Sequence, residues 1–320
     1  GATHGDDTTY PRLGSLIGFV APEQLISTAE GVVTVQRDYG NRQERQHARL
    51  KYTIDHRGLE WFKAELEQRL GFTLQPVRGY HFDHNGDRFG WIQGEDGKWH
   101  LGLYVASGRL WDEDGLQLLT GVREIARIHK GEFRLTCNQN MIIANVATRD
   151  KARIDKLVAQ YGLDGYKQQS GIRRYSIACV ALPTCGLAMA ESERYAPELI
   201  TKLESILDTH GLLNEPIQLR ISGCPNGCSR PYLAEIALIG RAPGRYDLRL
   251  GADFTGRRLN IVYRENITEP EILQTLDTLF AAYAANRLES EKFGDYLIRS
   301  ETLPAPTQNL IPIVLEAATQ

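Results

Sequence analysis

Four of the five cysteines fall in two short segments, and this clustering constrains the chain more than any other feature of its sequence. The first segment is Cys179-Val-Ala-Leu-Pro-Thr-Cys185 and the second is Cys224-Pro-Asn-Gly-Cys228. Proline and glycine predict that both segments are loops, in which the backbone can wrap a bound group instead of continuing a strand. The pattern therefore predicts a cysteine-ligated metal centre between two loops.

Spacing alone leaves three interpretations of this centre open: an iron–sulfur cluster, a zinc ion, or two buried cysteine pairs with no metal. Zinc sites usually pair cysteines two to four residues apart, so the C-x5-C pair is too wide, although the C-x3-C pair fits. Gly223 and Gly227 leave room for backbone N–H groups to approach sulfur atoms, and such bonds tune reduction potential. A redox centre is therefore favoured.

Length and composition limit the classes of protein that can carry this centre. At 320 residues the chain predicts two or three packed units, and its net charge of -3 with dispersed basic residues indicates neither a nucleic-acid nor a membrane partner. No apolar run approaches the roughly 18 residues of a spanning helix. Clustered cysteines fit a reducing compartment, so we expect a cytoplasmic protein. The chain begins with Gly1, so we expect a piece of a longer one.

Hydrophobic periodicity predicts an α+β fold. Residues 22–39 and 59–70 read as helices, and 76–148 as one unit with a hairpin over 89–105, a helix over 116–129 and two further strands. Beyond this unit the pattern predicts a helix over 150–158, a strand over 174–180, a helix over 187–210 interrupted at Pro197, strands over 217–221, 235–240, 247–250 and 258–263, and a capped helix from Thr268 to about residue 285.

Two further groups of polar residues have both a structural and a functional interpretation. The first group has helical spacing and is either a solvated face or a row of cations for an acidic ligand: Arg42, Arg45, Arg49 and Lys51. The second interrupts two apolar strands and is either a tight turn or a polar edge facing a ligand: Thr136, Asn138, Gln139 and Asn140. Cys137 among them is expected to be a small core residue.

Several long motifs are similar to those of the sulfite and nitrite reductase haemoproteins. Residues 179–194 and 222–228 resemble the cluster signature of that family, and residues 134–144 resemble its second motif. Residues 263–273 and 293–296 look most like the branch of assimilatory NADPH-dependent haemoprotein (beta) subunits. The resemblance runs from about His4 to the end of the chain.

The resemblance implies a [4Fe-4S] cluster held by Cys179, Cys185, Cys224 and Cys228, with Cys228 also the axial ligand of siroheme iron. Sulfite would bind the open haem face and be reduced to sulfide by six electrons from a flavoprotein (alpha) subunit. The basic row would meet the siroheme carboxylates, and the other expected cofactor contacts are Thr136, Asn138, Gln139, Asn140 and Asn226. Nitrite reduction is the alternative within the family, and a zinc-stabilised binding module is the alternative from another class.

The same resemblance implies a division into three parts. Residues 1–75 would end a preceding siroheme domain, 76–150 would form a ferredoxin-like half-domain, and 151–320 would form a mixed α/β domain that binds the [4Fe-4S] cluster and siroheme. Members of the family have two pseudo-equivalent halves, of which this chain matches the second. The arginines and lysines that grip sulfite are therefore expected mainly in the first half, and this piece alone is expected to be inactive.

Overall fold

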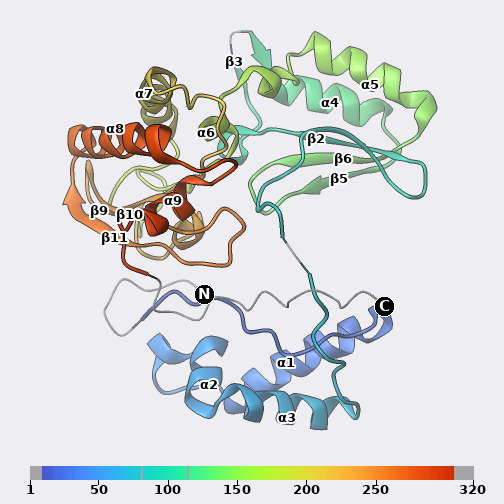
Figure 1. Ribbon diagram of the computed structural model, residues 1–320. Coiled ribbons are helices and arrows are strands. Elements are labelled where there is room, and N and C mark those ends of the chain that lie inside the picture. Colours follow the sequence, from blue (N-terminus) through green and yellow to red (C-terminus); the bar gives the residue numbers. More distant parts are fainter. Residues whose placement is uncertain (1–8, 81, 114, 306–320) are drawn as a thin grey trace.

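The computed structural model describes residues 9–80, 82–113 and 115–305, and these form a helical unit and two further units, each built on a larger sheet (Figure 1). The first unit is helical, and the other two each combine helices with a sheet that contains antiparallel strands, so the predicted α+β class is confirmed. No helix within these ranges has the length and apolar character needed to cross a membrane.

The first unit is a small group of helices with its own core. Val35, Phe62 and Leu66 are buried between the helices, where apolar residues recur three or four positions apart. Phe19 pairs with Gln75 in an isolated bridge that joins the entry and exit of the unit. An extended stretch then leads away to the sheets (Figure 1). The helices are α1 (Leu25–Tyr39), α2 (Leu50–Arg57) and α3 (Leu59–Leu70), with 3-10 turns at Pro22–Gln24 and Arg45–His47.

The expected helical face of basic residues does not form. The side-chain oxygen of Asn41 accepts hydrogen bonds from the backbone N–H groups of Gln43 and Glu44, at 3.0 and 2.9 Å, which turns the chain after Gly40. A 3-10 turn follows, and Arg49 is the residue that precedes α2. The basic side chains therefore lie on a turn, a 3-10 segment and a helix start instead of on one face.

The second unit is a four-stranded antiparallel sheet with strand order β1-β2-β6-β5, covered on one face by two helices (Figure 1). Its core includes Leu101, Ile125 and Ile143, and it extends through Ile154 of the second helix to Leu163. The boundary expected at residue 150 thus falls inside a helix that packs on this sheet. The elements are β1 (Gly90–Gln93), β2 (Trp99–Leu103), a 3-10 turn η3 (Ala106–Gly108), the small ribbon β3 (Asp112–Glu113) and β4 (Leu116–Gln117), α4 (Leu118–Ile128), β5 (Glu132–Leu135), β6 (Met141–Val146) and α5 (Thr148–Gln160).

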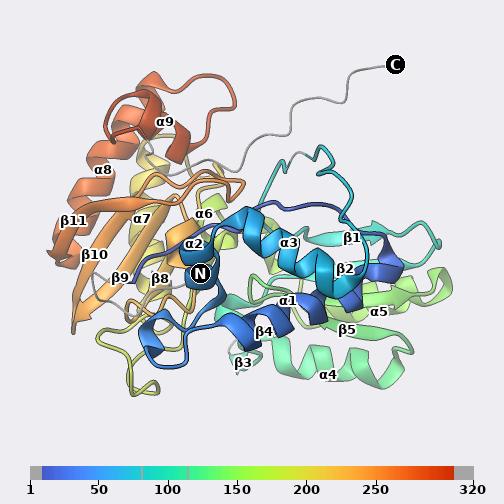
Figure 2. The same cartoon turned by 90° about the horizontal axis from the view of Figure 1, so that it is seen from below.

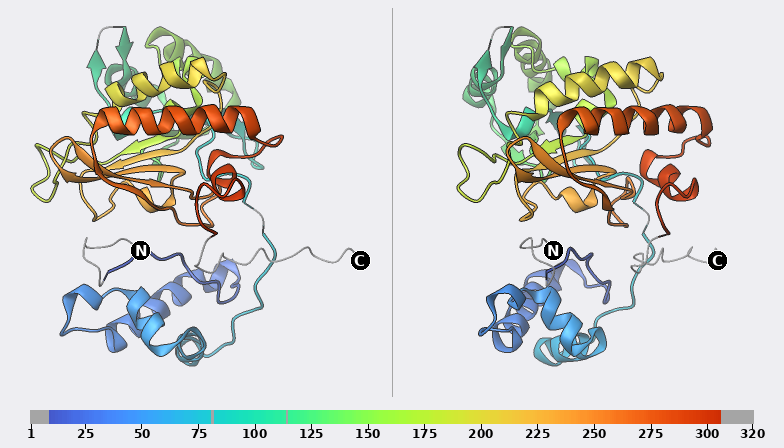
Figure 3. Two further views of the ribbon diagram at one scale, coloured as in Figure 1. Left: turned by 60° about the vertical axis from the view of Figure 1, so that its left-hand side comes forward. Right: turned by 90° about the vertical axis from the view of Figure 1, so that its left-hand side faces the viewer.

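The third unit is a five-stranded mixed sheet with strand order β11-β10-β9-β8-β7, in which β7, β8 and β9 run parallel. Two long helices, α7 and α8, lie side by side over one face (Figure 3). The elements are η4 (Gly165–Gln168), α6 (Gly171–Arg174), β7 (Ser176–Ala178), α7 (Ala196–Thr209), β8 (Leu219–Ser222), η5 (Pro231–Leu233), β9 (Ile236–Ala242), β10 (Arg245–Leu250), β11 (Ile261–Ile267), α8 (Glu269–Asn286) and α9 (Phe293–Arg299).

The helix expected over 187–210 is shorter than predicted. Pro197 lies in the first turn of α7 and so begins the helix instead of interrupting it. Proline is tolerated there because the first N–H groups of a helix have no partner within the helix. Residues 187–195 are consequently free to form part of the loop that carries the first cysteine pair.

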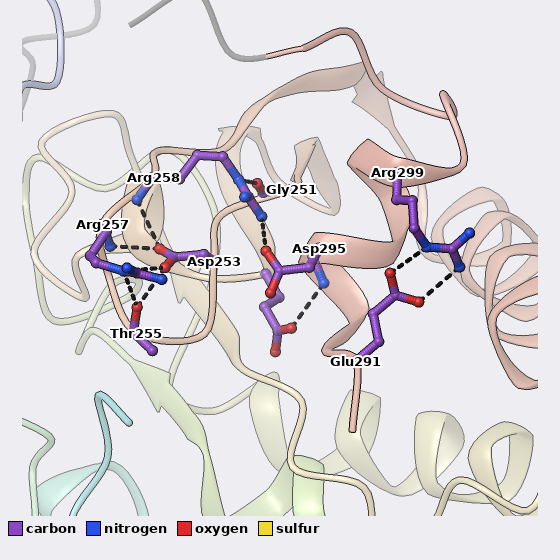
Figure 4. A network of polar contacts seen from close by, with 10 residues as sticks. Gly251, Asp253, Thr255, Arg257, Arg258, Glu291, Asp295 and Arg299 are labelled. Carbon is purple, nitrogen blue, oxygen red and sulfur yellow. Dashed lines mark hydrogen bonds and ion pairs between the residues drawn. The ribbon is translucent and has the colours of Figure 1, made fainter. Parts of the chain in front are cut away.

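The motif at residues 293–296 has a structural explanation in α9. A β-carbon at Gly294 would lie 1.9 Å from the carbonyl oxygen of Ala252, so the helix can approach that segment only with glycine. Asp295 accepts a hydrogen bond from Arg258 at 2.6 Å, and Arg258 also donates to Gly251 (Figure 4). Phe293 and Tyr296 are buried in the core. The motif therefore fastens α9 to the connection between β10 and β11.

Candidate metal centre

The two cysteine loops meet because they follow neighbouring parallel strands. Ala178 of β7 pairs with Ile221 of β8, and each strand ends within three residues of its first cysteine. The carboxyl ends of parallel strands lie at the same edge of a sheet, which is where ligands bind in many α/β folds. Cys179 and Cys224 are thereby brought to one edge.

The first loop protrudes from the body of the third unit (Figure 2), and it contacts the second cysteine loop at Gly223. Cys185 donates its backbone N–H to Ala181 at 2.7 Å, which closes a turn around the C-x5-C segment. The backbone N–H groups of Met189 and Ala190 both donate to the carbonyl oxygen of Gly223, at 2.7 and 3.0 Å. A side chain at position 223 would collide with this loop, so glycine is required for the two loops to touch.

One backbone group already points at a sulfur atom. The N–H of Gly223 donates to the Sγ of Cys179 at 3.2 Å, as expected of a group that tunes a cysteine-ligated centre. The N–H of Cys179 is itself within hydrogen-bond distance of the buried Ser192 hydroxyl at 3.1 Å, and that hydroxyl donates to Ile221 at 2.6 Å. The first cysteine is therefore fixed to β8 through both its backbone and its neighbours.

The four thiols lie close enough to influence one another. Burial raises the pKa of Cys228, and the nearby Cys179, Cys224 and Cys185 thiols raise it further. Repulsion between thiolates has this sign because each added negative charge disfavours the next. Bound metal cations would reverse it by stabilising all four thiolates. The donor set thus has the chemistry of a metal-thiolate centre.

Exposure distinguishes the four cysteines. Cys224 is buried, Cys179 and Cys185 are partly buried, and Cys228 is exposed. Within the described ranges no three His, Cys, Asp or Glu side chains converge closely enough to ligate one ion.

A cavity of about 300 Å³ opens beside the Cys228 turn, between the helical unit and the third unit. Gly227 on its wall has φ of +70°, and a β-carbon there would lie 2.9 Å from the Tyr232 ring. Its lining is apolar apart from two arginines: Pro11, Arg12, Leu13, Gly14, Gly227, Arg230, Tyr232, Leu233 and Leu259. A group bound in the cavity would lie beside the Cys228 turn and near two cationic side chains.

Comparison with known proteins gives matches of two kinds. The family model described as "Nitrite and sulphite reductase 4Fe-4S domain" matches residues 1–74, and the one described as "Nitrite/Sulfite reductase ferredoxin-like half domain" matches residues 92–161. Curated proteins named sulfite reductase [NADPH] hemoprotein beta-component match nearly the whole chain. The protein from Myxococcus xanthus is 56% identical over 96% of this chain, and the one from Geobacillus thermodenitrificans is 57% identical over 94%.

The chain belongs to the sulfite and nitrite reductase family. It spans about half the length of these curated relatives, 54% and 52% respectively. The solved structure of the Mycobacterium tuberculosis NirA protein covers 88% of the chain with a TM-score of 0.74 and 26% identity, and the chain covers 53% of that structure. The family resemblance inferred from the sequence is therefore confirmed.

The two family models match parts of the chain that do not include the clustered cysteines. Residues 1–74 contain no cysteine, and the four clustered cysteines lie outside both matched ranges. The ferredoxin-like match ends at residue 161, one residue beyond α5, which agrees with the core that α5 shares with the four-stranded sheet. We therefore place the boundary of the ferredoxin-like unit after α5.

The structure separates the four basic residues expected to contact a cofactor of the family. Arg42 and Arg45 are exposed, and Arg42 donates to the carbonyl oxygen of Arg37 at 2.8 Å. Arg49 is partly buried at the start of α2. Lys51 is buried between the rings of Tyr10 and Tyr52 and donates to the Tyr10 carbonyl oxygen, and burial lowers its pKa. Lys51 therefore packs within the helical unit, and its expected contact with a cofactor stays a prediction.

The polar residues between β5 and β6 are also engaged within the protein. Thr136, Asn138 and Asn140 donate to the carboxylate of Asp87, at 2.5, 3.1 and 2.8 Å. The amide of Gln139 donates to the backbone of Ala178 and accepts from it, at 2.8 and 3.3 Å. The contacts with Asp87 hold the turn between β5 and β6 together, which supports the interpretation of these residues as a turn. Gln139 in addition joins the ferredoxin-like unit to β7, the strand before Cys179.

The remaining expectations in this region have different outcomes. Asn226 is partly buried in the turn between Cys224 and Cys228, and its expected contact with a cofactor stays a prediction. Cys137 is exposed, so its expected place in the core is wrong. The cause is the turn geometry: its neighbour Gln139 has φ of +67°, and the residues on either side direct their side chains inward to Asp87.

Sequence reasoning missed three residues that hold this region together: Asp87, Arg220 and Arg230. Arg220 has 1% of its surface exposed, and its guanidinium donates to the carbonyl oxygen of Arg230 at 2.9 Å. Burial lowers the pKa of Arg220 to about 9. A signal was present, because Arg220 stands inside the predicted strand 217–221, and a charged side chain is almost never fully buried unless it is paired.

Proposed function

We propose that this chain carries the siroheme and [4Fe-4S] centre of a sulfite-reducing haemoprotein. The observation that supports the proposal is the arrangement of four thiols at the carboxyl ends of β7 and β8, with one of them exposed beside a cavity. Buried sulfurs suit ligands that contact one group, and an exposed sulfur at the rim suits a ligand shared by two groups.

In this proposal Cys179, Cys185 and Cys224 bind the cluster, and Cys228 binds both the cluster and the siroheme iron. When bound, the coupled centres would pass on the six electrons that the flavoprotein supplies, so that sulfite and six protons give sulfide and three molecules of water. The protein residues hold the thiolates in place, exclude water from the buried side and direct N–H groups at sulfur, as Gly223 does to Cys179.

Cations near the cavity provide the complement to anionic groups. Arg12 and Arg230 line the cavity, and we propose that Arg42, Arg45 and Arg49 of the helical unit meet the siroheme carboxylates. Because the chain spans about half of its relatives, the cations that grip sulfite are proposed to lie mainly outside it. The relatives' name "beta-component" supports a flavoprotein alpha subunit as electron donor, and the ligand thiolates support a cytoplasmic location.

The proposal is tested by purifying the protein anaerobically and measuring iron, acid-labile sulfide and siroheme per chain. We expect about four cluster irons and one haem iron, with siroheme absorption in the visible range. The chain should be compared with its full-length parent, using a reduced viologen dye with sulfite and, separately, with nitrite. Faster turnover of nitrite would assign the alternative reaction, and zinc without iron or sulfide would overturn the proposal.

Replacement of Cys228 by serine tests the shared ligand. We expect Cys228→Ser to change the siroheme and the cluster absorption bands together, because one sulfur serves both. The matched control is Cys137→Ser, which replaces an exposed cysteine outside the two loops and should leave both sets of bands unchanged. A change confined to the cluster bands would show that Cys228 is not shared.

A further inference from the structure

The turn that carries Cys228 is fixed on one side by its own sheet. Ser229 is buried, and its hydroxyl lies 2.6 Å from the hydroxyl of Ser222 at the end of β8. The buried guanidinium of Arg220 donates to the carbonyl oxygen of Arg230. These contacts hold the backbone that follows Cys228, but they act from beneath the turn.

The other side of the turn is held by the ferredoxin-like unit. The Nη2 of Arg230 donates to the carbonyl oxygen of Cys137 and to the Oδ1 of Asn138, both at 2.6 Å. Arg230 has φ of +55° and ψ of +49°, a left-handed conformation that few residues other than glycine adopt. Such a conformation persists where surrounding contacts determine it, and here they come from two different units.

Asn138 is itself held by a carboxylate. Its Nδ2 donates to Asp87 at 3.1 Å while its Oδ1 accepts from Arg230, so both ends of the amide have a charged partner. Asp87 also accepts from Thr136 and Asn140, which fixes the whole turn between β5 and β6. The contacts therefore run without a gap from Asp87 through Asn138 to Arg230, two residues after Cys228.

We propose that Asp87, Asn138 and Arg230 form a positioning relay, through which the ferredoxin-like unit sets the position of the Cys228 thiol. The relay deepens the proposed function, since a sulfur shared by two metal centres must be held to within about 0.5 Å. A short exposed turn anchored from one side could swing, whereas anchoring from both sides fixes it. The three residues are positioning residues and do not themselves bind the metals.

The first test uses the protein loaded with siroheme and cluster. Arg230→Met removes the guanidinium and keeps the length of the side chain, so we expect the haem absorption and electron paramagnetic resonance signals to broaden or split into more than one species. Arg230→Lys should recover part of the single signal. The control is Arg134→Met, on an exposed arginine of the ferredoxin-like unit that pairs with Glu132. Signals identical to those of this control would overturn the relay.

A double variant tests whether the residues act as one unit. We expect Asn138→Ala to change the haem signals as Arg230→Met does, and the double variant to be no worse than the more affected single variant. Effects that simply add would mean that the two side chains act separately, and the relay would be wrong.

A measurement on the protein without its cofactors tests the relay independently of the proposed function. In the metal-free chain, we expect Arg230→Met to make hydrogen exchange of the amides in residues 226–230 about tenfold faster, since the turn loses its outer anchor. Exchange at the same rate as in Arg134→Met would overturn the relay even if both cofactors bind. Faster exchange in a protein that binds no siroheme would support the relay and overturn the proposed function.

Discussion

At the scale of single residues, the metal centre depends on a glycine where its two loops touch. A β-carbon at position 223 would lie 2.5 Å from the β-carbon of Ala181 and 2.7 Å from the carbonyl oxygen of Ala190. Overpacking of a filled site costs about 1–3 kcal/mol, so we expect Gly223→Ala to lower the free energy of unfolding by that amount. Because the loops would separate, iron and acid-labile sulfide bound per chain should fall as well.

The matched control for this substitution lies in the same pair of loops. Gly186 follows Cys185, as position 223 precedes Cys224, but a β-carbon added to it meets no atom within 4 Å. Gly186→Ala should therefore keep both its stability and its metal content. Equal metal content in the two variants, measured by elemental analysis, would show that the close approach is not needed.

At the scale of elements, α8 begins with a reciprocal capping box. The carboxylate of Glu271 accepts hydrogen bonds from the backbone N–H and the hydroxyl of Thr268, at 2.9 and 2.8 Å, and the pKa of Glu271 is lowered by these bonds. Since an N-cap hydroxyl typically contributes about 1 kcal/mol, we expect Thr268→Ala to reduce the free energy of unfolding by about that amount.

Urea-induced unfolding followed by circular dichroism measures the cap, with a second threonine of α8 as reference. Thr278 donates its hydroxyl to Gln274 inside the helix, so Thr278→Ala should be neutral or slightly stabilising, because alanine has the higher helix propensity. If the two variants unfold at the same urea concentration, the capping box does not stabilise α8.

At the scale of the whole molecule, an ion pair joins the ferredoxin-like unit to the first cysteine loop. Arg109, which follows η3, donates to both carboxylate oxygens of Glu193, and the distance to Oε2 is 2.9 Å. Glu193 is 9% exposed and its backbone N–H donates to Cys179 at 3.0 Å. The pair therefore connects the packing of two units to Cys179, a proposed metal ligand.

A double-mutant cycle with Arg109→Met and Glu193→Gln measures this connection. We expect a coupling energy of about 0.5–3 kcal/mol from the free energies of unfolding, because the carboxylate is buried and the pair is bidentate. The reference cycle uses Glu124 and Arg127, an exposed pair within α4, for which about 0.2–0.5 kcal/mol is expected. A coupling no larger than in the reference cycle would mean that the pair does not join the units.

The sequence by itself determined the fold class, the family and most of the elements, and it predicted four cysteine ligands. The spacing of the cysteines and the periodicity of the apolar residues are patterns of residues close together in the chain. Loops, helices and strands are determined over the same short range. For this reason the loops around Cys179 and Cys224, the helix after Thr268 and the family were all predicted without a structure.

The tertiary structure decided which polar residues serve the site and which serve the packing. Gln139 and Asn138 are both amides, and the sequence gives the same two interpretations for each. In the structure their hydrogen-bond partners differ: they are Ala178 and Asp87, which lie 39 and 51 positions away in the chain. Lys51 was expected to face a ligand and is instead buried against aromatic rings. The packing of the units determines which partner such a side chain meets. These long-range contacts produce no regular pattern in the sequence, so the sequence alone does not predict them.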